Sequence, residues 1–135
     1  MSTIKGFLKR REERLAVTQE VYLEGFDEPF IIKATSNKEN ERLAKNFRKT
    51  RLTKGGKRES VLDDEAYGAA LVVQSIVTPD LHNAEIQEFY GTQGDAIATL
   101  KEMVSMGEYL KLQNAISKLN GFDEDDEEFV EEVKK

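Results

Sequence analysis

The feature that most constrains the fold is an apolar stripe near the C-terminal end of the chain. Its members are spaced three, four and three residues apart: Tyr109, Leu112, Ile116 and Leu119. This spacing places them on one face of an α-helix, and the Asn120-Gly121 pair that follows is typical of a helix C-terminus. The pattern predicts a helix over residues 107–119 with one face packed against other elements.

Four further helices are predicted from start and stop signals. They are expected at about residues 37–50, 64–77, 83–90 and 94–104. Ser36 begins a capping box before the first of them, and Asp63 or Asp64 caps the second. Asn83 caps the third helix and Gly91 closes it, since asparagine favours the position before a helix and glycine the position after it.

Two strands are predicted before the helices. Val17, Val21 and Leu23 share one parity in the first strand, and Phe30 and Ile32 share one in the second. Turn residues lie between the two strands, so residues 17–35 are expected to form a hairpin. Because a two-stranded hairpin is marginally stable alone, it is expected to dock on the helices.

These elements predict an α+β fold, predominantly α-helical, with an N-terminal two-stranded β-hairpin docked on a compact helical domain. A length of 135 residues is typical of one domain. We expect residues 1–15 to form an N-terminal arm, residues 16–122 the single globular domain, and residues 123–135 an acidic C-terminal tail.

Charge is segregated along the chain. The net charge is −6, and residues 121–135 contain eight acidic residues and two lysines. Residues 38–58 contain nine basic residues and two acidic ones. Within this basic segment, residues 51–60 include Gly55-Gly56 and are expected to be a flexible loop. The division also suggests self-association of the basic middle of one copy with the acidic tail of another.

Four cations of the basic segment are spaced four, three and four residues apart: Lys38, Arg42, Lys45 and Lys49. On the predicted helix over residues 37–50 they share one face. A solvated face is the simplest interpretation. Docking of an acidic partner or of the protein's own tail, and contact with nucleic acid, are alternatives that the pattern leaves open. The acidic overall charge and the lack of a stacking-aromatic pattern argue against nucleic acid.

Catalysis and metal binding lack the residues that they need. Cysteine is absent, and His82 is the one histidine, placed beside the predicted helix start at Asn83. A zinc site would need carboxylates from elsewhere, and consecutive carboxylates in a solvated tail do not provide the two distinct environments of acid–base catalysis. We therefore predict no enzyme activity, no cofactor and no metal. No run approaches the roughly 18 apolar residues of a membrane span, so no membrane association is expected.

Two stretches carry a resemblance to a known family, PDLHNAEIQEFYG and MGEYLKLQNAISKLNGFD. The most specific pieces are Pro79-Asp80-Leu81, Asn83-Ala84-Glu85, Tyr90-Gly91, Gly107-Glu108-Tyr109 and Leu119-Asn120-Gly121-Phe122. Here the sequence resembles the XkdN-like phage tail assembly chaperones of tailed phages and prophages of Gram-positive bacteria. The resemblance covers nearly the whole chain. It departs at Thr92-Gln93-Gly94, where a proline-containing helix entry is expected, and this affects local geometry only.

The resemblance implies a non-enzymatic protein of the bacterial host cytoplasm that is absent from the mature virion. Such a protein would bind the tape measure protein and keep it soluble for tail tube assembly. A programmed frameshift would yield a longer form that recruits the tail tube protein. Two alternatives from other classes are a small nucleic-acid-binding regulator that uses residues 38–58 and a minor virion structural protein.

Partner-binding residues are expected on the helices and in the charged regions. Met103, Met106, Tyr109 and Leu112 are predicted to line a groove for an apolar helix, since methionine adapts to varied surfaces. The alternative is that these four side chains form the protein's own core. The remaining candidates are Leu81, Tyr90, Phe129 and Val130, together with the cations Lys38, Arg42, Lys45 and Lys49.

Overall fold

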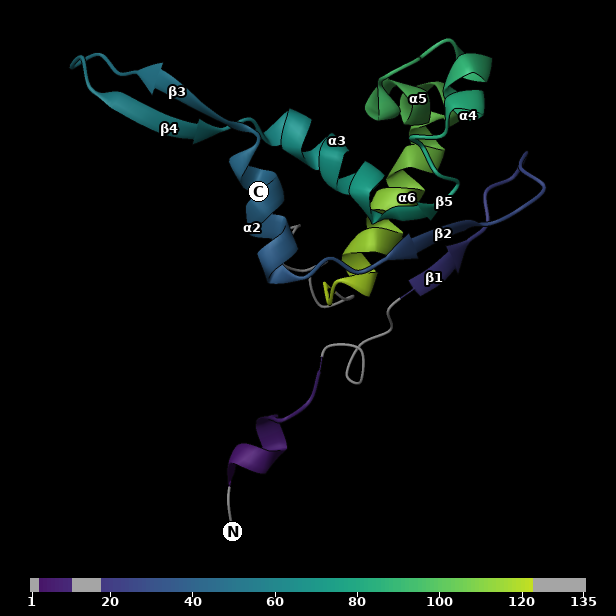
Figure 1. Cartoon of the computed structure of the whole chain (residues 1–135), viewed down its shortest axis with the longest axis horizontal. Coiled ribbons are helices and arrows are strands. Elements are labelled where there is room, and N and C mark those ends of the chain that lie inside the picture. The colour runs from purple at the N-terminus through teal and green to yellow at the C-terminus, as the bar shows by residue number, and fades with distance from the viewer. Residues whose placement is uncertain (1–2, 11–17, 123–135) are drawn as a thin grey trace.

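The computed structural model describes residues 3–10 and 18–122, whose arrangement is shown in Figure 1. In this part of the chain a short 3-10 helix, η1 (Thr3–Phe7), precedes five strands and five α-helices. The strands are β1 (Thr18–Val21), β2 (Phe30–Lys33), β3 (Arg48–Leu52), β4 (Arg58–Leu62) and β5 (Ile76–Thr78). The helices are α2 (Asn37–Lys45), α3 (Asp64–Ser75), α4 (Ala84–Tyr90), α5 (Ala96–Met103) and α6 (Met106–Leu119). The fold is mixed α+β.

The predicted N-terminal hairpin is present as β1 and β2, but it belongs to a larger sheet. The strand order is β1-β2-β5, with both pairings antiparallel. The prediction that residues 64–77 form one helix is wrong at its end, because α3 stops at Ser75. Ile76 takes an extended conformation and pairs with Ile32, so the residues after Ser75 add a third strand instead of continuing the helix.

The basic segment contains a second sheet, where a helix end and a flexible loop were predicted. Helix α2 ends at Lys45, and β3 and β4 then pair antiparallel from Arg48↔Leu62 to Leu52↔Arg58. Figure 1 shows this hairpin extending away from the rest of the fold. The prediction failed because the strand RKTRL is exposed along its whole length and lacks the apolar alternation that identifies a half-buried strand.

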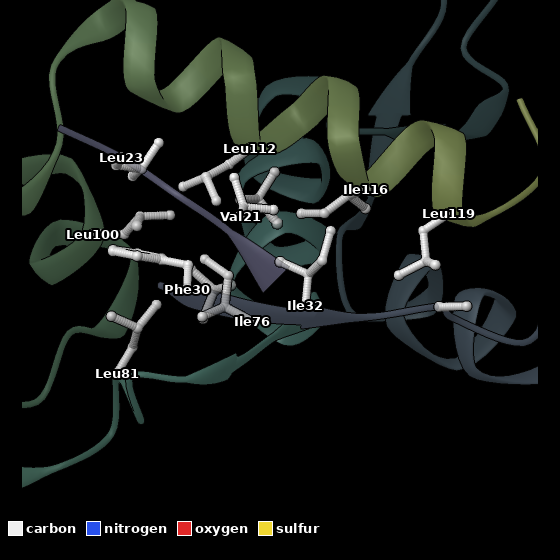
Figure 2. Close-up of a cluster of buried hydrophobic side chains, with 13 residues drawn as sticks. Val21, Leu23, Phe30, Ile32, Ile76, Leu81, Leu100, Leu112, Ile116 and Leu119 are labelled. Atoms are coloured by element: carbon white, nitrogen blue, oxygen red, sulfur yellow. The ribbon is translucent and has the colours of Figure 1, made fainter. Parts of the chain in front are cut away.

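The core lies where the three-stranded sheet meets α3, α5 and α6, as Figure 2 shows. Its members are Val21, Leu23, Phe30, Ile32, Ala34, Val72, Val73, Ile76, Leu81, Leu100, Leu112, Ile116 and Leu119. The strand parities and the apolar stripe of α6 therefore predicted the buried faces correctly. Each large side chain buried in this way stabilises the fold by about 1.5–3 kcal/mol.

The helix caps are formed largely as predicted. The Ser36 hydroxyl accepts a hydrogen bond from the Glu39 backbone N–H at 3.1 Å and completes a capping box. The side chains of Asp63 and Asn83 cap α3 and α4. Gly91 closes α4 with a φ of 68°, a left-handed conformation that favours glycine. A second capping box, at the start of α6, was not predicted.

Candidate functional site

A hollow of about 550 Å³ lies between the β1–β2 loop and α4. Its wall includes Phe26, Phe30, Pro29, Pro79, Ile86, Phe89, Tyr90 and Met103, and we call this hollow the aromatic groove. Aromatic residues and methionine are enriched at protein-binding surfaces. The aromatic groove is therefore the candidate functional site.

Two edge-to-face aromatic pairs form its walls. The ring centroids of Phe26 and Phe30 are 5.4 Å apart, and those of Phe89 and Tyr90 are 4.9 Å apart. The Phe30 side chain is only 2% exposed and joins the groove to the core, whereas Phe89 is 79% exposed. The groove thus combines a firmly packed wall with an aromatic ring that has most of its surface in solvent.

Helix α4 is held in place by the buried side chain of Gln87. Its Nε2 donates a hydrogen bond to the Leu81 carbonyl at 2.9 Å, and its Oε1 accepts one from the Gly94 backbone N–H at 2.9 Å. One amide thereby joins the segments before and after α4 and fixes the helix that carries Phe89. Sequence reasoning missed Gln87. In the sequence, Gln87 could be recognised only as a long amide side chain on a short predicted helix between two turns. The backbone groups of such turns need hydrogen-bond partners, which a long amide can supply.

Three carboxylates lie along the same hollow. Asp27 and Glu28 come from the β1–β2 loop, and Glu85 comes from the first turn of α4. An apolar surface bordered by negative charge favours a partner whose apolar side chains are flanked by lysine or arginine.

The structure divides the predicted partner-binding residues among several places. Tyr90 and Met103 line the aromatic groove together. Leu81 and Leu112 are 2% and 0% exposed and belong to the core, so in this fold they offer no surface to a partner. Leu112 thus fits the alternative prediction, in which it forms part of the protein's own core.

Met106 and Tyr109 lie at a second hollow, of about 430 Å³, among α3, α5 and α6. The Met106 side chain is 80% exposed, whereas Tyr109 is half-buried against the core. Burial raises the pKa of the Tyr109 hydroxyl above its ordinary value. Met103 and Met106 were predicted to share one groove, but they line different hollows.

The predicted row of cations is interrupted by the change from helix to strand. Lys38, Arg42 and Lys45 are exposed on α2, but Lys49 lies on β3. Its Nζ is 2.9 Å from the Asp63 carboxylate. That hydrogen bond, together with one from the Ala66 backbone N–H, holds the pKa of Asp63 below its ordinary value. The other two candidates, Phe129 and Val130, lie outside the described residues.

Within residues 3–10 and 18–122, no cluster of histidine and carboxylate side chains is arranged to hold a metal ion. The exposed His82 lies at the entry to α4, where its backbone N–H donates a hydrogen bond to Asp80 Oδ1 at 3.0 Å. In the same described part of the chain, no helix has the length and apolar character needed to cross a membrane.

Comparison with known proteins identifies relatives over most of the chain. The family described as phage XkdN-like tail assembly chaperone protein matches residues 4–134. The chain is 31% identical over 107 residues to the phage-like element PBSX protein XkdN of Bacillus subtilis strain 168, covering 78% of this chain and 72% of that one. It is 33% identical over 112 residues to the uncharacterized protein YqbN of the same strain, covering 82% and 74%.

The fold is also similar to a solved structure. The crystal structure of YqbN matches with a TM-score of 0.59 at 26% identity, over 79% of this chain and 88% of that chain. Because the family match spans nearly the full length of the sequence, this chain belongs to the XkdN-like phage tail assembly chaperone family.

Proposed function

We propose that this protein binds the tape measure protein of its phage or prophage and keeps it soluble while the tail tube assembles. Membership in a tail assembly chaperone family supports the general role. The single observation that supports a binding mode is the aromatic groove with Phe89 79% exposed beside it. Large exposed aromatic side chains often contribute most of the binding energy at protein interfaces.

The proposed ligand of the groove is an apolar stripe on a helix of the tape measure protein. Such a stripe presents side chains three and four residues apart, which a concave aromatic surface accommodates without a unique sequence. Met103 in the wall adds adaptability. The carboxylates of Asp27, Glu28 and Glu85 would favour client segments with flanking cations.

The proposal is tested by co-expression with the tape measure gene of the same gene cluster. The tape measure protein is expected to be insoluble alone, and soluble and co-purifying when this chain is present. A tape measure protein that stays insoluble and unbound beside this chain contradicts the proposal.

Two further parts of the proposal have their own readouts. The protein acts as a non-enzymatic factor in the bacterial host cytoplasm and is absent from the mature virion, so mass spectrometry of purified particles should not detect it. Detection in stoichiometric amounts would favour the minor virion structural protein instead.

A frameshifted longer form that recruits the tail tube protein should appear as an extended C-terminus in mass spectra of infected or induced cells.

The β3–β4 hairpin favours a second candidate function, a nucleic-acid-binding regulator. Its exposed cations are Arg48, Lys49, Arg51, Lys54, Lys57 and Arg58. Two of them have carboxylate partners, since Lys49 pairs with Asp63 and Arg51 lies 3.7 Å from Glu59. The remaining charge suits phosphate contacts, which strengthen as salt is lowered. A gel shift at low salt with no retardation would remove this candidate.

A further inference from the structure

Helix α2 leaves much of its apolar edge uncovered. It packs beside α3, yet none of its residues is buried. Leu43 and Ala44 are only half-buried. A helix with a strongly one-sided apolar pattern normally buries that side, so the surface beside α2 is suited to a further apolar segment.

Two adjoining hollows follow this surface. One, of about 360 Å³, is bordered by Tyr67, Leu71, Ile116 and Phe122 among others, and the next, of about 390 Å³, by Ala44, Leu62, Lys45 and Arg48 among others. Asn40 and Tyr67 line both hollows, so the two lie next to each other, and together we call them the α2–α3 groove. The first hollow combines these apolar side chains with polar ones such as Thr35 and Ser36, and the second combines apolar contacts with Lys45, Arg48 and the carboxylate of Glu41.

The described part of the chain ends beside the first hollow of this groove. Phe122 lines the first hollow and is 63% exposed. Its backbone N–H donates to the Ser117 carbonyl at 2.9 Å, which fixes its position at the end of α6. Residues 123–135 therefore begin next to the α2–α3 groove.

The composition of residues 123–135 matches the groove. The segment contains eight carboxylates and two lysines, with Phe129, Val130 and Val133 among them. Lys45 and Arg48 at the far end offer opposite charge, and Ala44 and Leu62 offer apolar contact. Attraction between opposite charges near a protein surface is appreciable at contact distance and is weakened by salt.

The length of the segment also fits. Phe129 lies seven residues after Phe122, a separation of about 10 Å along a helix and up to about 23 Å in an extended chain. The nine-residue helix α2, along which the groove runs, is about 13 Å long. Phe129 and Val130 can therefore reach the hollow beside Lys45 and Arg48 from the same chain.

We propose that residues 123–135 dock in the α2–α3 groove of their own chain. Phe129 and Val130 contact the surface near Ala44 and Leu62, and the neighbouring carboxylates face Lys45 and Arg48. The acidic tail then covers the open side of α2 and neutralises part of the basic segment. This inference stands apart from tape measure binding, because it concerns a different groove.

The test uses disulfide formation in the full-length chain, which contains no natural cysteine. Glu131→Cys is combined with Glu41→Cys, an exposed residue that lines the groove. The matched control combines Glu131→Cys with Glu102→Cys, an exposed glutamate of α5, which lies well away from α2 in Figure 1. Non-reducing gels after mild oxidation separate a disulfide within one chain from a disulfide between two chains.

The intramolecular disulfide between positions 41 and 131 should form about tenfold faster than that of the control pair, because docking raises the effective concentration of the two thiols. Two double substitutions should each reduce this difference in rate: Lys45→Glu with Arg48→Glu, and Phe129→Ser with Val130→Ser. Equal rates for the two pairs would overturn the proposal. A faster rate at position 41 that these substitutions leave unchanged would also overturn it, because an undocked tail tethered at Phe122 reaches the nearer thiol more often. Mainly intermolecular disulfides at position 41 would also overturn it, and would show that a second copy occupies the groove.

Discussion

The side-chain oxygen of Asn120 accepts a hydrogen bond from the backbone N–H of Thr35 at 2.7 Å, across 85 positions of sequence. The side-chain nitrogen of Asn120 donates to the Ile116 carbonyl at 2.9 Å. One amide therefore ends α6 and joins it to the segment that leads into α2. The same junction fixes where residues 123–135 begin.

Replacing Asn120 by alanine should lower the free energy of unfolding by about 1–3 kcal/mol, because the partly buried Thr35 N–H loses its partner. Urea denaturation monitored by circular dichroism measures the change. Asn114→Ala is the matched control, since Asn114 is exposed on the same helix and should change stability by at most about 0.5 kcal/mol. Equal effects of the two substitutions would show that the Asn120 hydrogen bonds contribute no more to stability than the exposed side chain of Asn114 does.

Leu112 and Leu110 form a second matched pair on α6. The Leu112 side chain is 0% exposed in the core, whereas Leu110 is 50% exposed. Leu112→Ala should lower the free energy of unfolding by about 2–5 kcal/mol, since it removes buried contacts and leaves a cavity. Leu110→Ala should cost no more than about 0.5 kcal/mol. A Leu112 variant as stable as the natural chain would contradict the assignment of this side chain to the core.

Asp63 provides a prediction about pH. The hydrogen bonds from Lys49 and from the Ala66 N–H hold the pKa of Asp63 below its ordinary value of 3.8 in the folded protein. Folding therefore favours the ionised carboxylate. This contribution to stability is complete above pH 3.8 and is lost as the pH falls through the lower, folded-state pKa.

Asp63→Asn should accordingly lower the free energy of unfolding at neutral pH. In strong acid, the free energies of unfolding of the variant and the natural chain should become equal. Urea unfolding at about pH 7 and at about pH 2.5 measures the two differences. The adjacent, exposed Asp64 supplies the control substitution Asp64→Asn. A constant difference between Asp63→Asn and the natural chain across this range would rule out the ionised pair as the cause.

Local signals predicted the parts of the fold that depend on local contacts. Ser36 and Asn83 accept hydrogen bonds from backbone N–H groups three residues away, so a short stretch of sequence contains the whole interaction. Gly91 likewise acts within one turn. The stripe ending at Leu119 was recognisable because its helical spacing is independent of what covers it.

Elements that depend on distant pairing were not predictable in the same way. Ile76 belongs to an apolar run that continues α3 in sequence, and only its pairing with Ile32 makes it part of a strand. The β3–β4 hairpin carries charged residues throughout, and its base is held by the pairing of Lys49 with Asp63. Periodicity also shows that Leu112 lies on one face of a helix without showing whether that face meets the sheet or a partner.

Two of the residues predicted to bind a partner, Tyr90 and Met103, line the aromatic groove, but Phe89 was not named as a candidate. In sequence, Phe89 resembles any apolar residue of an amphipathic helix. Its 79% exposure results from the way Gln87 orients α4, which is a tertiary effect.

Binding of the tape measure protein at the aromatic groove is tested by capture with the variant Phe89→Asp. Tagged natural chain, Phe89→Asp and Leu110→Asp are each co-expressed with the tape measure protein, and the captured amount is measured at several expression levels. Leu110 is the control because it is 50% exposed on α6, away from the groove. All three chains should show similar thermal unfolding.

Loss of an aromatic anchor typically costs about 2 kcal/mol or more, which weakens binding roughly thirtyfold. Phe89→Asp should capture little tape measure protein, whereas Leu110→Asp should capture as much as the natural chain. Undiminished capture by a folded Phe89→Asp chain would contradict binding at the aromatic groove.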